Sequence, residues 1–424
     1  MTCHGDSAIR FSFFSSVLTR IPSRWSEISS VLNEAHGTEN GCMTDSSLDS
    51  SHEIPAAAFR RSLANRHAHA AEAMRRVLSS GQLILGTEVS DFETEFAAFT
   101  GTQHAVGVAS GTDALILALR ALEIGPEDEV ICVANGPVPT VAAIRAVGAT
   151  PRFVDVDSGT LQLDVNLVEM ALTTRTRCLL PVHLYGCPVD LDPLVSLAES
   201  HNLKLIEDCA QAHGARYGNR HVGTSAAIGC FSFYPTKNLA ALGDAGACIT
   251  NDPNLDQRLR ELRMYGFRGR AIAEIDGMNS RLDELQAALL RPALAALPAA
   301  LQQRSEHAAA YLSGLNSDLL RLPNVTARGT AAWHQFVIRS PNRDAIQRLL
   351  REDSILCGIH YAWPVHLMPA YKDPGDGAPS LPVTEQACDE VLSLPILPEL
   401  TSDEISRVID AVNRTALQQE SHSR

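Results

Sequence analysis

Apolar runs of strand length alternate with helical segments between residues 104 and 250. The runs are HAVGVAS, EVICVAN, TPRFVDVD, TRCLLPVHLYG, LKLIEDCAQ, IGCFSFYP and GACITND. Strands that are apolar on both faces belong to sheets covered by helices on both sides, and their alternation with helices is typical of βαβ units. The pattern therefore predicts an α/β fold built on a mostly parallel sheet.

Helical periodicity continues on both sides of this region. Amphipathic stretches precede the first strand-like run, and a long helical segment spans residues 280–315. Pro292 and Pro298 lie inside that segment, so we expect a kink or a break there. The residues beyond it mix short strands with helices, which indicates a smaller α+β domain.

The first 54 residues differ in composition from the rest of the chain. They contain twelve serines and show no clear periodicity, which is typical of a poorly ordered extension. We therefore predict three parts. These are an extension at 1–54, a large α/β domain with an N-terminal helical arm at 55–300, and a small α+β domain at 301–424.

Composition narrows the classes of function. The chain has 424 residues and a formal net charge of −14, whereas nucleic-acid binding needs clustered excess lysine and arginine. No apolar run reaches the roughly 18–20 residues of a membrane span. The ten cysteines are scattered singly without a CxxC pair, which favours reduced thiols over disulfides or a zinc site. We expect a cytoplasmic enzyme with no metal and no nucleic-acid or membrane partner.

The first chemical signal is the segment Ser110-Gly111-Thr112-Asp113, which follows a strand-like run and opens a helix. A small glycine-containing turn there leaves backbone N–H groups free at the helix N-terminus, where the helix dipole favours an anion. The spacing matches neither a Walker loop nor a dinucleotide fingerprint. An ordinary strand–helix turn, capped by Ser110 or Thr112, is the competing interpretation.

Two further signals follow the later strands. Asp208 ends the run LKLIE, at the sheet edge where α/β folds present ligands, and could pair with a cationic ring nitrogen, bind a metal or cap a helix. Lys237 stands between an aromatic strand and a glycine-rich turn. In a desolvated pocket its pKa would fall and its amine would attack carbonyls, whereas on the surface it would be an ordinary solvated lysine.

Four segments, taken together and in their order along the chain, resemble the DegT/DnrJ/StrS-type nucleotide-sugar aminotransferases. They are SGTDAL, EDCAQAHGA, SFYPTKNLAALGDAGA and GMNSRLDELQAA. The resemblance covers about residues 57–415 and includes GQLILGTEV, HLYG and GIHYAWPVHLMPAY. It implies the type I fold of pyridoxal-phosphate-dependent transferases, with a seven-stranded sheet in the large domain. It also implies pyridoxal 5′-phosphate as the cofactor and a homodimer with shared active sites.

The resemblance assigns a role to each matching residue. Lys237 would bind the cofactor covalently and move the proton from the donor's Cα, and Asp208 would keep the pyridine ring cationic. Gln211 would lie against the ring oxygen. Gly111, Thr112 and Ser232 would hold the phosphate, and Asn279 would reach the phosphate of the neighbouring subunit's cofactor. Without the resemblance, Asn279 and Ser280 simply precede a long helix, with Ser280 and Asp283 forming a near capping box.

The same resemblance implies a nucleotide-linked keto sugar as acceptor and an amino-acid donor, usually glutamate. Tyr265, in the segment LRMYG, is similar to members that aminate C3 of a 3-keto-6-deoxyhexose, whereas C4 members more often carry histidine. His360 and Tyr361 are placed in the sugar pocket by family position, although a partly buried structural role is equally compatible. The expected product would enter amino-sugar or polysaccharide biosynthesis.

One position departs from the family pattern. Where relatives carry an aromatic residue stacked on the pyridine ring, alignment places Pro137 in VANGPVPTVAAI. Proline lacks the π-face and the buried area of an aromatic side chain. Two alternatives therefore accompany the aminotransferase hypothesis: a pyridoxal-phosphate-dependent sugar dehydratase or lyase, and a non-catalytic regulatory homologue. The dehydratase branch carries histidine at the position of Lys237, which favours transamination.

Overall fold

The structure is a computed structural model that describes residues 53–56, 61, 67–269, 272–372 and 379–423. The predicted extension lies outside the described residues except for its last two positions. Of these, Ile54 is 1% exposed and forms a bridge with Ile355. Ile54 thus packs into the hydrophobic core of the C-terminal part of the chain.

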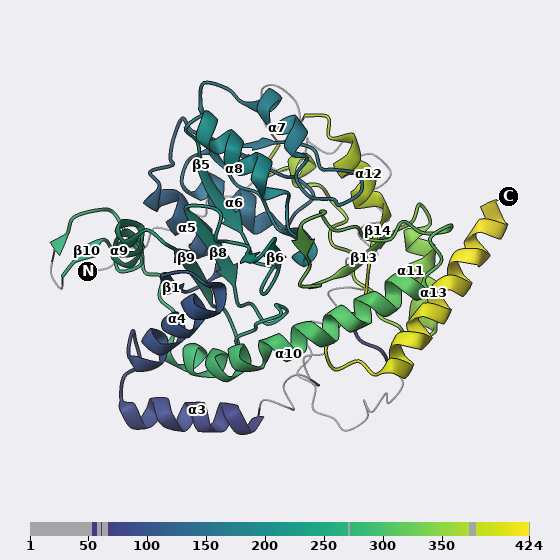
Figure 1. Ribbon diagram of the computed structural model, residues 1–424, viewed down its shortest axis with the longest axis horizontal. Coiled ribbons are helices and arrows are strands. Elements are labelled where there is room, and N and C mark those ends of the chain that lie inside the picture. Colours follow the sequence, from purple (N-terminus) through teal and green to yellow (C-terminus); the bar gives the residue numbers. More distant parts are fainter. Residues whose placement is uncertain (1–52, 57–60, 62–66, 270–271, 373–378, 424) are drawn as a thin grey trace, which may run out of the picture. The chain divides into compact units, whose positions relative to one another are not determined.

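A seven-stranded sheet forms the centre of the large α/β part (Figure 1). Its strands, in spatial order, are β1 (His104–Val108), β9 (Gly246–Thr250), β8 (Ile228–Ser232), β5 (Lys204–Asp208), β4 (Thr176–Leu179), β2 (Glu129–Cys132) and β3 (Thr150–Phe153). β9 runs antiparallel to both β1 and β8, and the pairs from β8 to β3 are parallel. The predicted mostly parallel seven-stranded sheet is therefore confirmed.

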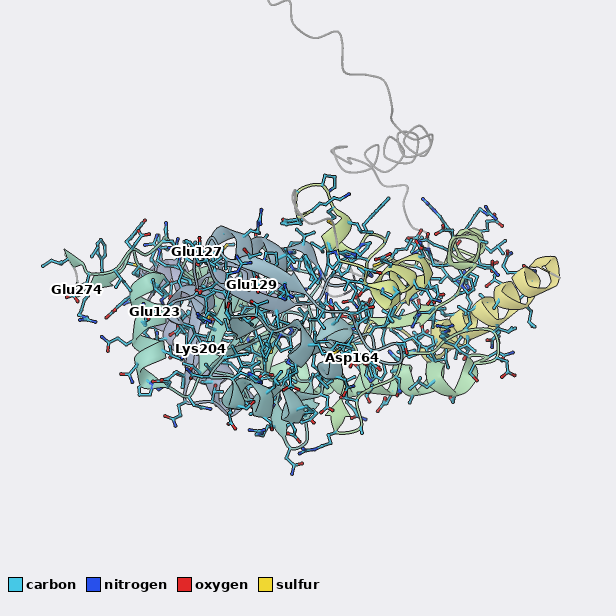
Figure 2. The ribbon with its side chains drawn as sticks, turned by 90° about the horizontal axis from the view of Figure 1, so that it is seen from above. Glu123, Glu127, Glu129, Asp164, Lys204 and Glu274 are labelled. Carbon is cyan, nitrogen blue, oxygen red and sulfur yellow. The ribbon has the colours of Figure 1, made fainter. Side chains whose placement is uncertain are left out.

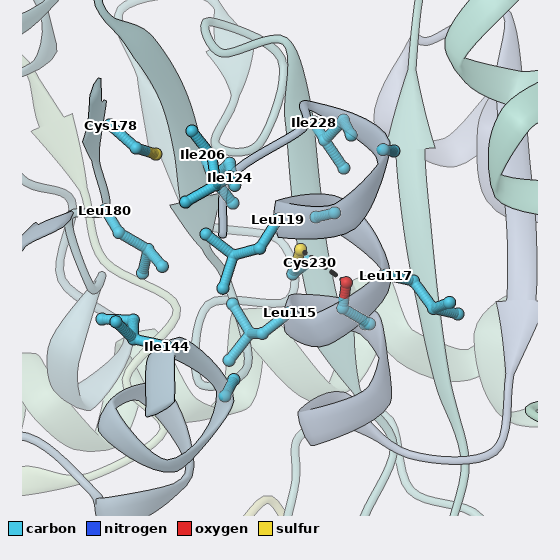
Figure 3. Packing of buried hydrophobic residues seen from close by; sticks show 14 of the residues in the cluster. Leu115, Leu117, Leu119, Ile124, Ile144, Cys178, Leu180, Ile206, Ile228 and Cys230 are labelled. Atoms are coloured by element: carbon cyan, nitrogen blue, oxygen red, sulfur yellow. Dashed lines mark hydrogen bonds between the residues drawn. The ribbon is translucent and has the colours of Figure 1, made fainter. Parts of the chain in front are cut away.

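Helices cover both faces of this sheet, as the doubly apolar strands predicted. Within β2, Val130 and Cys132 face one core, whereas Ile131 faces another. The first core is closed by α5 (Gly111–Ala121), α6 (Val138–Ala146) and α9 (Pro253–Leu262). Figure 3 shows Leu115 and Leu119 of α5 packed within it. Each fully buried leucine of this kind contributes about 1.5–3 kcal/mol.

The opposite face is covered by α4 (Thr87–Thr100), α8 (Leu191–Ser200) and the first half of α10 (Glu284–Gly314). α10 continues through Pro292 and Pro298, so a break, one of the two predicted alternatives, is wrong, and a kink stays a prediction. Each proline removes one backbone hydrogen bond at a cost of about 3 kcal/mol. Burial of Leu290, Leu294 and Leu297 against the sheet and α4 offsets that cost.

The C-terminal part contains a two-stranded antiparallel sheet of β13 (Phe336–Arg339) and β14 (Val391–Leu394), covered by helices. These helices are α11 (Arg343–Glu352), α12 (Pro382–Glu390) and α13 (Ser402–Ser423). The second half of α10 adds Tyr311 to their core. The predicted boundary at 300/301 lies within α10, which runs along both parts (Figure 1). The division into two domains stays a prediction.

Smaller elements complete the described chain. They are α3 (His67–Ser80), which packs on α10, α7 (Val165–Ala171), the hairpin β10 (Phe267–Arg268) with β11 (Ile272–Ala273), the sheet of β6 (Arg216–Tyr217), β7 (Arg220–His221) and β12 (Gly329–Thr330), and the 3-10 turns η1 (Leu184–Gly186) and η2 (Val365–Leu367). Charged side chains such as Glu123, Glu127 and Lys204 project from the surface (Figure 2). Among the described residues, no helix has both the length and the apolar character to cross a membrane.

Candidate functional site

The parallel strands β5 and β8 bring two predicted site residues to the same sheet edge. Asp208 is the last residue of β5 and Ser232 the last of β8. Asp208 is 2% exposed, and its carboxylate accepts hydrogen bonds from Thr140 Oγ1 at 2.7 Å and from the Ala210 N–H at 3.1 Å. Burial raises the pKa of Asp208, and these two hydrogen bonds oppose that effect. The site therefore presents a buried carboxylate at the end of its strand.

Lys237 lies in the turn after β8, where its backbone N–H donates to the Tyr234 carbonyl at 2.8 Å. Burial lowers the pKa of Lys237 to about 8, and the negative charge of Asp208 works in the opposite direction. The amine is therefore close enough to the Asp208 carboxylate to feel its charge, and it is partly neutral near pH 8. Lys237 is half-buried, and its lowered pKa fits the desolvated-pocket interpretation better than the solvated-surface one.

The N-terminus of α5 lies against Ser232. The α5 N-cap is Ser110, whose side chain accepts from the Asp113 N–H and whose carbonyl accepts from the Ala114 N–H. The N–H groups of Gly111 and Thr112 therefore precede the first hydrogen bonds of the helix. A Cβ on Gly111 would lie 2.5 Å from Ser232 Cβ and 3.0 Å from Ser232 Oγ. Glycine is thus required for this approach, which places a hydroxyl beside the helix end.

Gln211 connects the sheet edge to the C-terminal part. Its Oε1 accepts from the Tyr185 N–H at 2.7 Å, and its Nε2 donates to the Tyr361 hydroxyl at 3.1 Å. The Tyr185 hydroxyl in turn donates to the His360 carbonyl at 2.6 Å. Burial raises the pKa of Tyr361 to about 12, so its hydroxyl stays protonated at neutral pH. The structure therefore brings Gln211, His360 and Tyr361 together.

Tyr265 and Asn279 lie on two backbone segments that pair with each other. Tyr265 is 43% exposed, and its N–H donates to the Met278 carbonyl at 3.0 Å, beside the bridge between Met264 and Asn279. Asn279 is also exposed. Neighbouring Ser280 does not cap α10, because Asp283 holds the N-cap position. The predicted capping box is therefore wrong, and Ser280 instead donates to Asp113 of α5 at 2.7 Å.

A buried cluster of metal-ligating types lies behind Asp208. Ligand atoms of His183, Glu207 and Cys209 are within 4.8 Å of one another. Hydrogen bonds already occupy this cluster, because His183 bonds to Glu207 at 2.8 Å and accepts from the Val189 N–H at 3.1 Å. The Glu207 carboxylate also accepts three backbone N–H groups of the 223–226 turn. The cluster therefore braces that turn, which supports a structural role for His183.

The sequence model of the DegT/DnrJ/EryC1/StrS aminotransferase family matches residues 65–413, which contain the whole site described above. The chain belongs to this family. The predicted family and fold are thus confirmed.

Known proteins are similar to this aminotransferase over most of its length. It is 49% identical over 349 residues to the dTDP-3-amino-3,4,6-trideoxy-alpha-D-glucose transaminase of Streptomyces venezuelae, covering 81% of this chain and 91% of that protein. The crystal structure of DesV from S. venezuelae, in complex with a ketimine intermediate, superposes with a TM-score of 0.84 at 47% identity, covering 86% of this chain and 98% of that one. NtdA of Bacillus subtilis, with bound cofactor PMP, follows at 30% identity and a TM-score of 0.78, covering 83% and 82%. The chain is therefore a pyridoxal-phosphate-dependent aminotransferase.

The residues of this aminotransferase fit that cofactor. A phosphate needs hydrogen-bond donors in a region of positive potential, which the free N–H groups at the start of α5 and the Ser232 hydroxyl supply. A pyridinium nitrogen needs a carboxylate that no arginine already neutralises. Among the described residues, the Asp208 carboxylate accepts hydrogen bonds only from the Thr140 hydroxyl and the Ala210 N–H. An aldehyde needs a nearby amine with a lowered pKa, which Lys237 provides.

Sequence reasoning missed Thr140, which bonds directly to Asp208 from the first turn of α6. Pro137 is the N-cap of the same helix and is half-buried. Thr140 therefore directs its hydroxyl at Asp208 from the helix that Pro137 begins. The segment VANGPVPTVAAI contains Thr140, but the sequence identifies it as a site residue only once the start of α6 is known to lie beside Asp208.

Proposed function

We propose that this enzyme transfers an amino group from glutamate to the C3 keto group of a nucleotide-activated 3-keto-6-deoxyhexose. The observation that carries the proposal is the buried carboxylate of Asp208, whose charge acts on the amine of half-buried Lys237, at the sheet edge where Ser232 also lies against Gly111. The most similar relatives are named as transaminases of dTDP-3-amino sugars, which supports the choice of C3. The dehydratase, lyase and non-catalytic alternatives are not favoured, because Lys237 is present and the relatives at 46–49% identity include two that are named as sugar transaminases.

We assign the cofactor-side roles as follows. When bound, pyridoxal phosphate supplies an electron sink for the pair of electrons left at Cα when the donor loses its proton. Lys237 removes and returns that proton at its Nζ. Asp208 stabilises a positive charge on the ring nitrogen, and Gln211 offers its amide beside the ring oxygen. Gly111, Thr112 and Ser232 donate hydrogen bonds to the phosphate.

On the substrate side, we assign His360 and Tyr361 to the sugar pocket. Tyr361 keeps its proton and donates or accepts through its hydroxyl, which Gln211 already orients. Burial lowers the pKa of His360 to about 4, so its ring is neutral and suits a sugar hydroxyl better than a phosphate. Tyr265 would approach the sugar from the exposed end of the segment that pairs with Met278 and Asn279.

The test is a glutamate-dependent transamination screen over 3-keto and 4-keto nucleotide sugars, with the product position read by NMR. We expect nitrogen at C3 and stoichiometric formation of 2-oxoglutarate. Amination at C4 would correct the regiochemistry, and loss of a hydroxyl without 2-oxoglutarate would favour the dehydratase alternative.

We further propose a cytoplasmic homodimer. Apolar side chains are exposed on α3 and just after it, and others surround the loop of Lys237. These residues are Met74, Leu78, Leu83, Ile84, Tyr234 and Leu242. A second copy would bury them, and would also bring a partner's Asn279 to the phosphate cradle. The eight described cysteines carry no disulfide, which agrees with a reducing compartment.

Mixing two inactive variants tests the shared site. In a heterodimer of Lys237→Ala and Asn279→Ala chains, one site receives an intact lysine from one chain and an intact asparagine from the other. We expect about half of the wild-type activity per heterodimer, measured after tagged co-purification. If Asn279 serves its own chain's site, mixing restores nothing. The control is a heterodimer of Lys237→Ala with Thr236→Ala, which changes an exposed neighbouring residue.

The pKa of Lys237 predicts a pH dependence for capture of the cofactor. Only the neutral amine attacks an aldehyde, and this fraction rises as the pH passes through about 8. We therefore expect the rate at which cofactor-free protein develops a visible absorption band with added pyridoxal phosphate to increase from pH 7 to pH 9. A rate that is flat over this range would contradict a neutral amine as the limiting species.

A further inference from the structure

The turn that contains the segment HLYG has a backbone that neighbouring segments hold in place. The His183 N–H donates to the Asp208 carbonyl at 3.0 Å, and the Tyr185 carbonyl accepts from the Gln335 N–H at 3.2 Å. Within this turn Tyr185 has φ of +62°, a left-handed conformation that non-glycine residues rarely adopt. Such a conformation persists only where the surroundings enforce it, and it clusters at functional sites.

The backbone N–H of Tyr185 determines which end of the Gln211 amide faces the turn. An N–H only donates, so the atom that it meets at 2.7 Å must be the amide oxygen, Oε1. The amide nitrogen therefore points the other way, where it donates to the Tyr361 hydroxyl at 3.1 Å. That nitrogen carries a second hydrogen, which is left for an acceptor within the site. Tyr185 thus makes Gln211 a hydrogen-bond donor toward the site.

The side chain of Tyr185 holds a different part of the site. It is 5% exposed, and its hydroxyl donates to the His360 carbonyl at 2.6 Å. Burial raises the pKa of Tyr185 well above its ordinary value, so the hydroxyl keeps its proton and remains a donor. The ring of His360 is held separately, because its Nδ1 lies 2.8 Å from the Ser393 hydroxyl.

One residue therefore contacts both groups of side chains to which roles are assigned above. Its N–H bonds to Gln211, and its hydroxyl bonds to the residue that precedes Tyr361. Tyr361 packs against the same hydrophobic cluster as Tyr185, and it closes the network through its bond to Gln211. None of the roles assigned above uses Tyr185 itself.

We propose that Tyr185 is a positioning residue that links the cofactor side of the site to the sugar side. Its N–H orients the Gln211 amide, and its hydroxyl holds the His360 backbone so that Tyr361 reaches that amide. The keto sugar then meets side chains whose places are already set relative to the cofactor. This inference rests on the roles proposed for Gln211, His360 and Tyr361.

Tyr185→Phe tests the hydroxyl alone, because the variant keeps the backbone N–H that orients Gln211. We expect KM for the keto nucleotide sugar to rise roughly 5- to 10-fold, since the buried His360 carbonyl loses its donor. The glutamate half-reaction should change by less than about twofold, since no hydrogen bond to Gln211 is lost. Single-turnover measurements of the two half-reactions give the two values separately.

Tyr311→Phe is the matched control. Tyr311 is also fully buried, and its hydroxyl donates to a backbone carbonyl, that of Pro395, at 2.7 Å. The two variants should therefore lose similar thermal stability, but Tyr311→Phe should change neither half-reaction. In the full chain without cofactor, hydrogen exchange of the backbone amides at 358–361 should become faster in Tyr185→Phe and not in Tyr311→Phe.

Equal slowing of both half-reactions in Tyr185→Phe would overturn the proposal, as would unchanged exchange at 358–361. If Tyr185→Phe does not fold, Ser393→Ala frees His360 from its other side and should raise the same KM. An unchanged KM in that variant would also contradict the proposal. If wild-type protein forms no 2-oxoglutarate from glutamate, the proposed function itself is wrong, whereas the exchange measurement still tests the contact between Tyr185 and His360.

Discussion

Lys237→Ala should abolish the visible absorption band of the bound cofactor and reduce turnover by on the order of 10⁴-fold or more. The variant loses both the amine that captures the aldehyde and the base that moves the Cα proton, and a positioned general base alone contributes about 10²–10⁴-fold. The spectrum of the purified protein and the glutamate half-reaction measure the two losses separately. Because Asp208, Ser232 and the start of α5 are unchanged, noncovalent cofactor binding should persist.

The chain offers matched controls for this variant. Lys204 and Lys372 are both exposed and lie outside the site described above. Lys204→Ala and Lys372→Ala should therefore retain the band and the turnover. Survival of the band in Lys237→Ala would mean that another amine binds the cofactor, and the lysine assignment would be wrong.

Much of the sheet could be predicted because strand burial depends on local composition. The seven apolar runs correspond to the seven strands from β1 to β9, with the short β6 and β7 lying outside the main sheet. The reversed direction of β9 did not follow from burial. It follows from the connection, since residues 233–245 contain no helix, and a parallel pair needs a crossover that usually contains one.

The site was predictable only where its residues lie in short motifs. Asp208 and Gln211 share one motif, and Ser232 and Lys237 share another, so the resemblance could locate all four. Thr140 could not be located in this way, because its partner Asp208 is 68 residues away along the chain. Contacts of that range exist only after the sheet has formed.

Pro137 illustrates a different limit of motif reasoning. The sequence indicates the loss of an aromatic residue, but the structure places Pro137 at the N-cap of α6, on the helix that also carries Thr140. Thr140 donates a hydrogen bond to the Asp208 carboxylate from that helix. The first turn of α6 therefore supports Asp208 even though the N-cap residue lacks an aromatic ring.

The second large effect concerns the negative charge of Asp208. Asp208→Asn should reduce the rate of the glutamate half-reaction by on the order of 10²- to 10³-fold, because the ring nitrogen loses its buried counter-charge, and removing one partner of such a pair costs about 3–5 kcal/mol. Asp208 also raises the pKa of Lys237, so its loss should move the midpoint for cofactor capture below about 8. Capture at pH 7 should thus become faster while turnover becomes slower.

This opposite response distinguishes loss of charge from misfolding, which would slow both steps. Thr140→Val is the matched control, since it removes one hydrogen bond of 2.7 Å to Asp208 but keeps the carboxylate. A hydrogen bond to a charged group contributes about 1.5–3 kcal/mol, so the half-reaction should slow by roughly 10- to 100-fold with the visible band retained. If Asp208→Asn slows turnover no more than Thr140→Val does, the charge on Asp208 is not what stabilises the ring, and another residue must pair with its nitrogen.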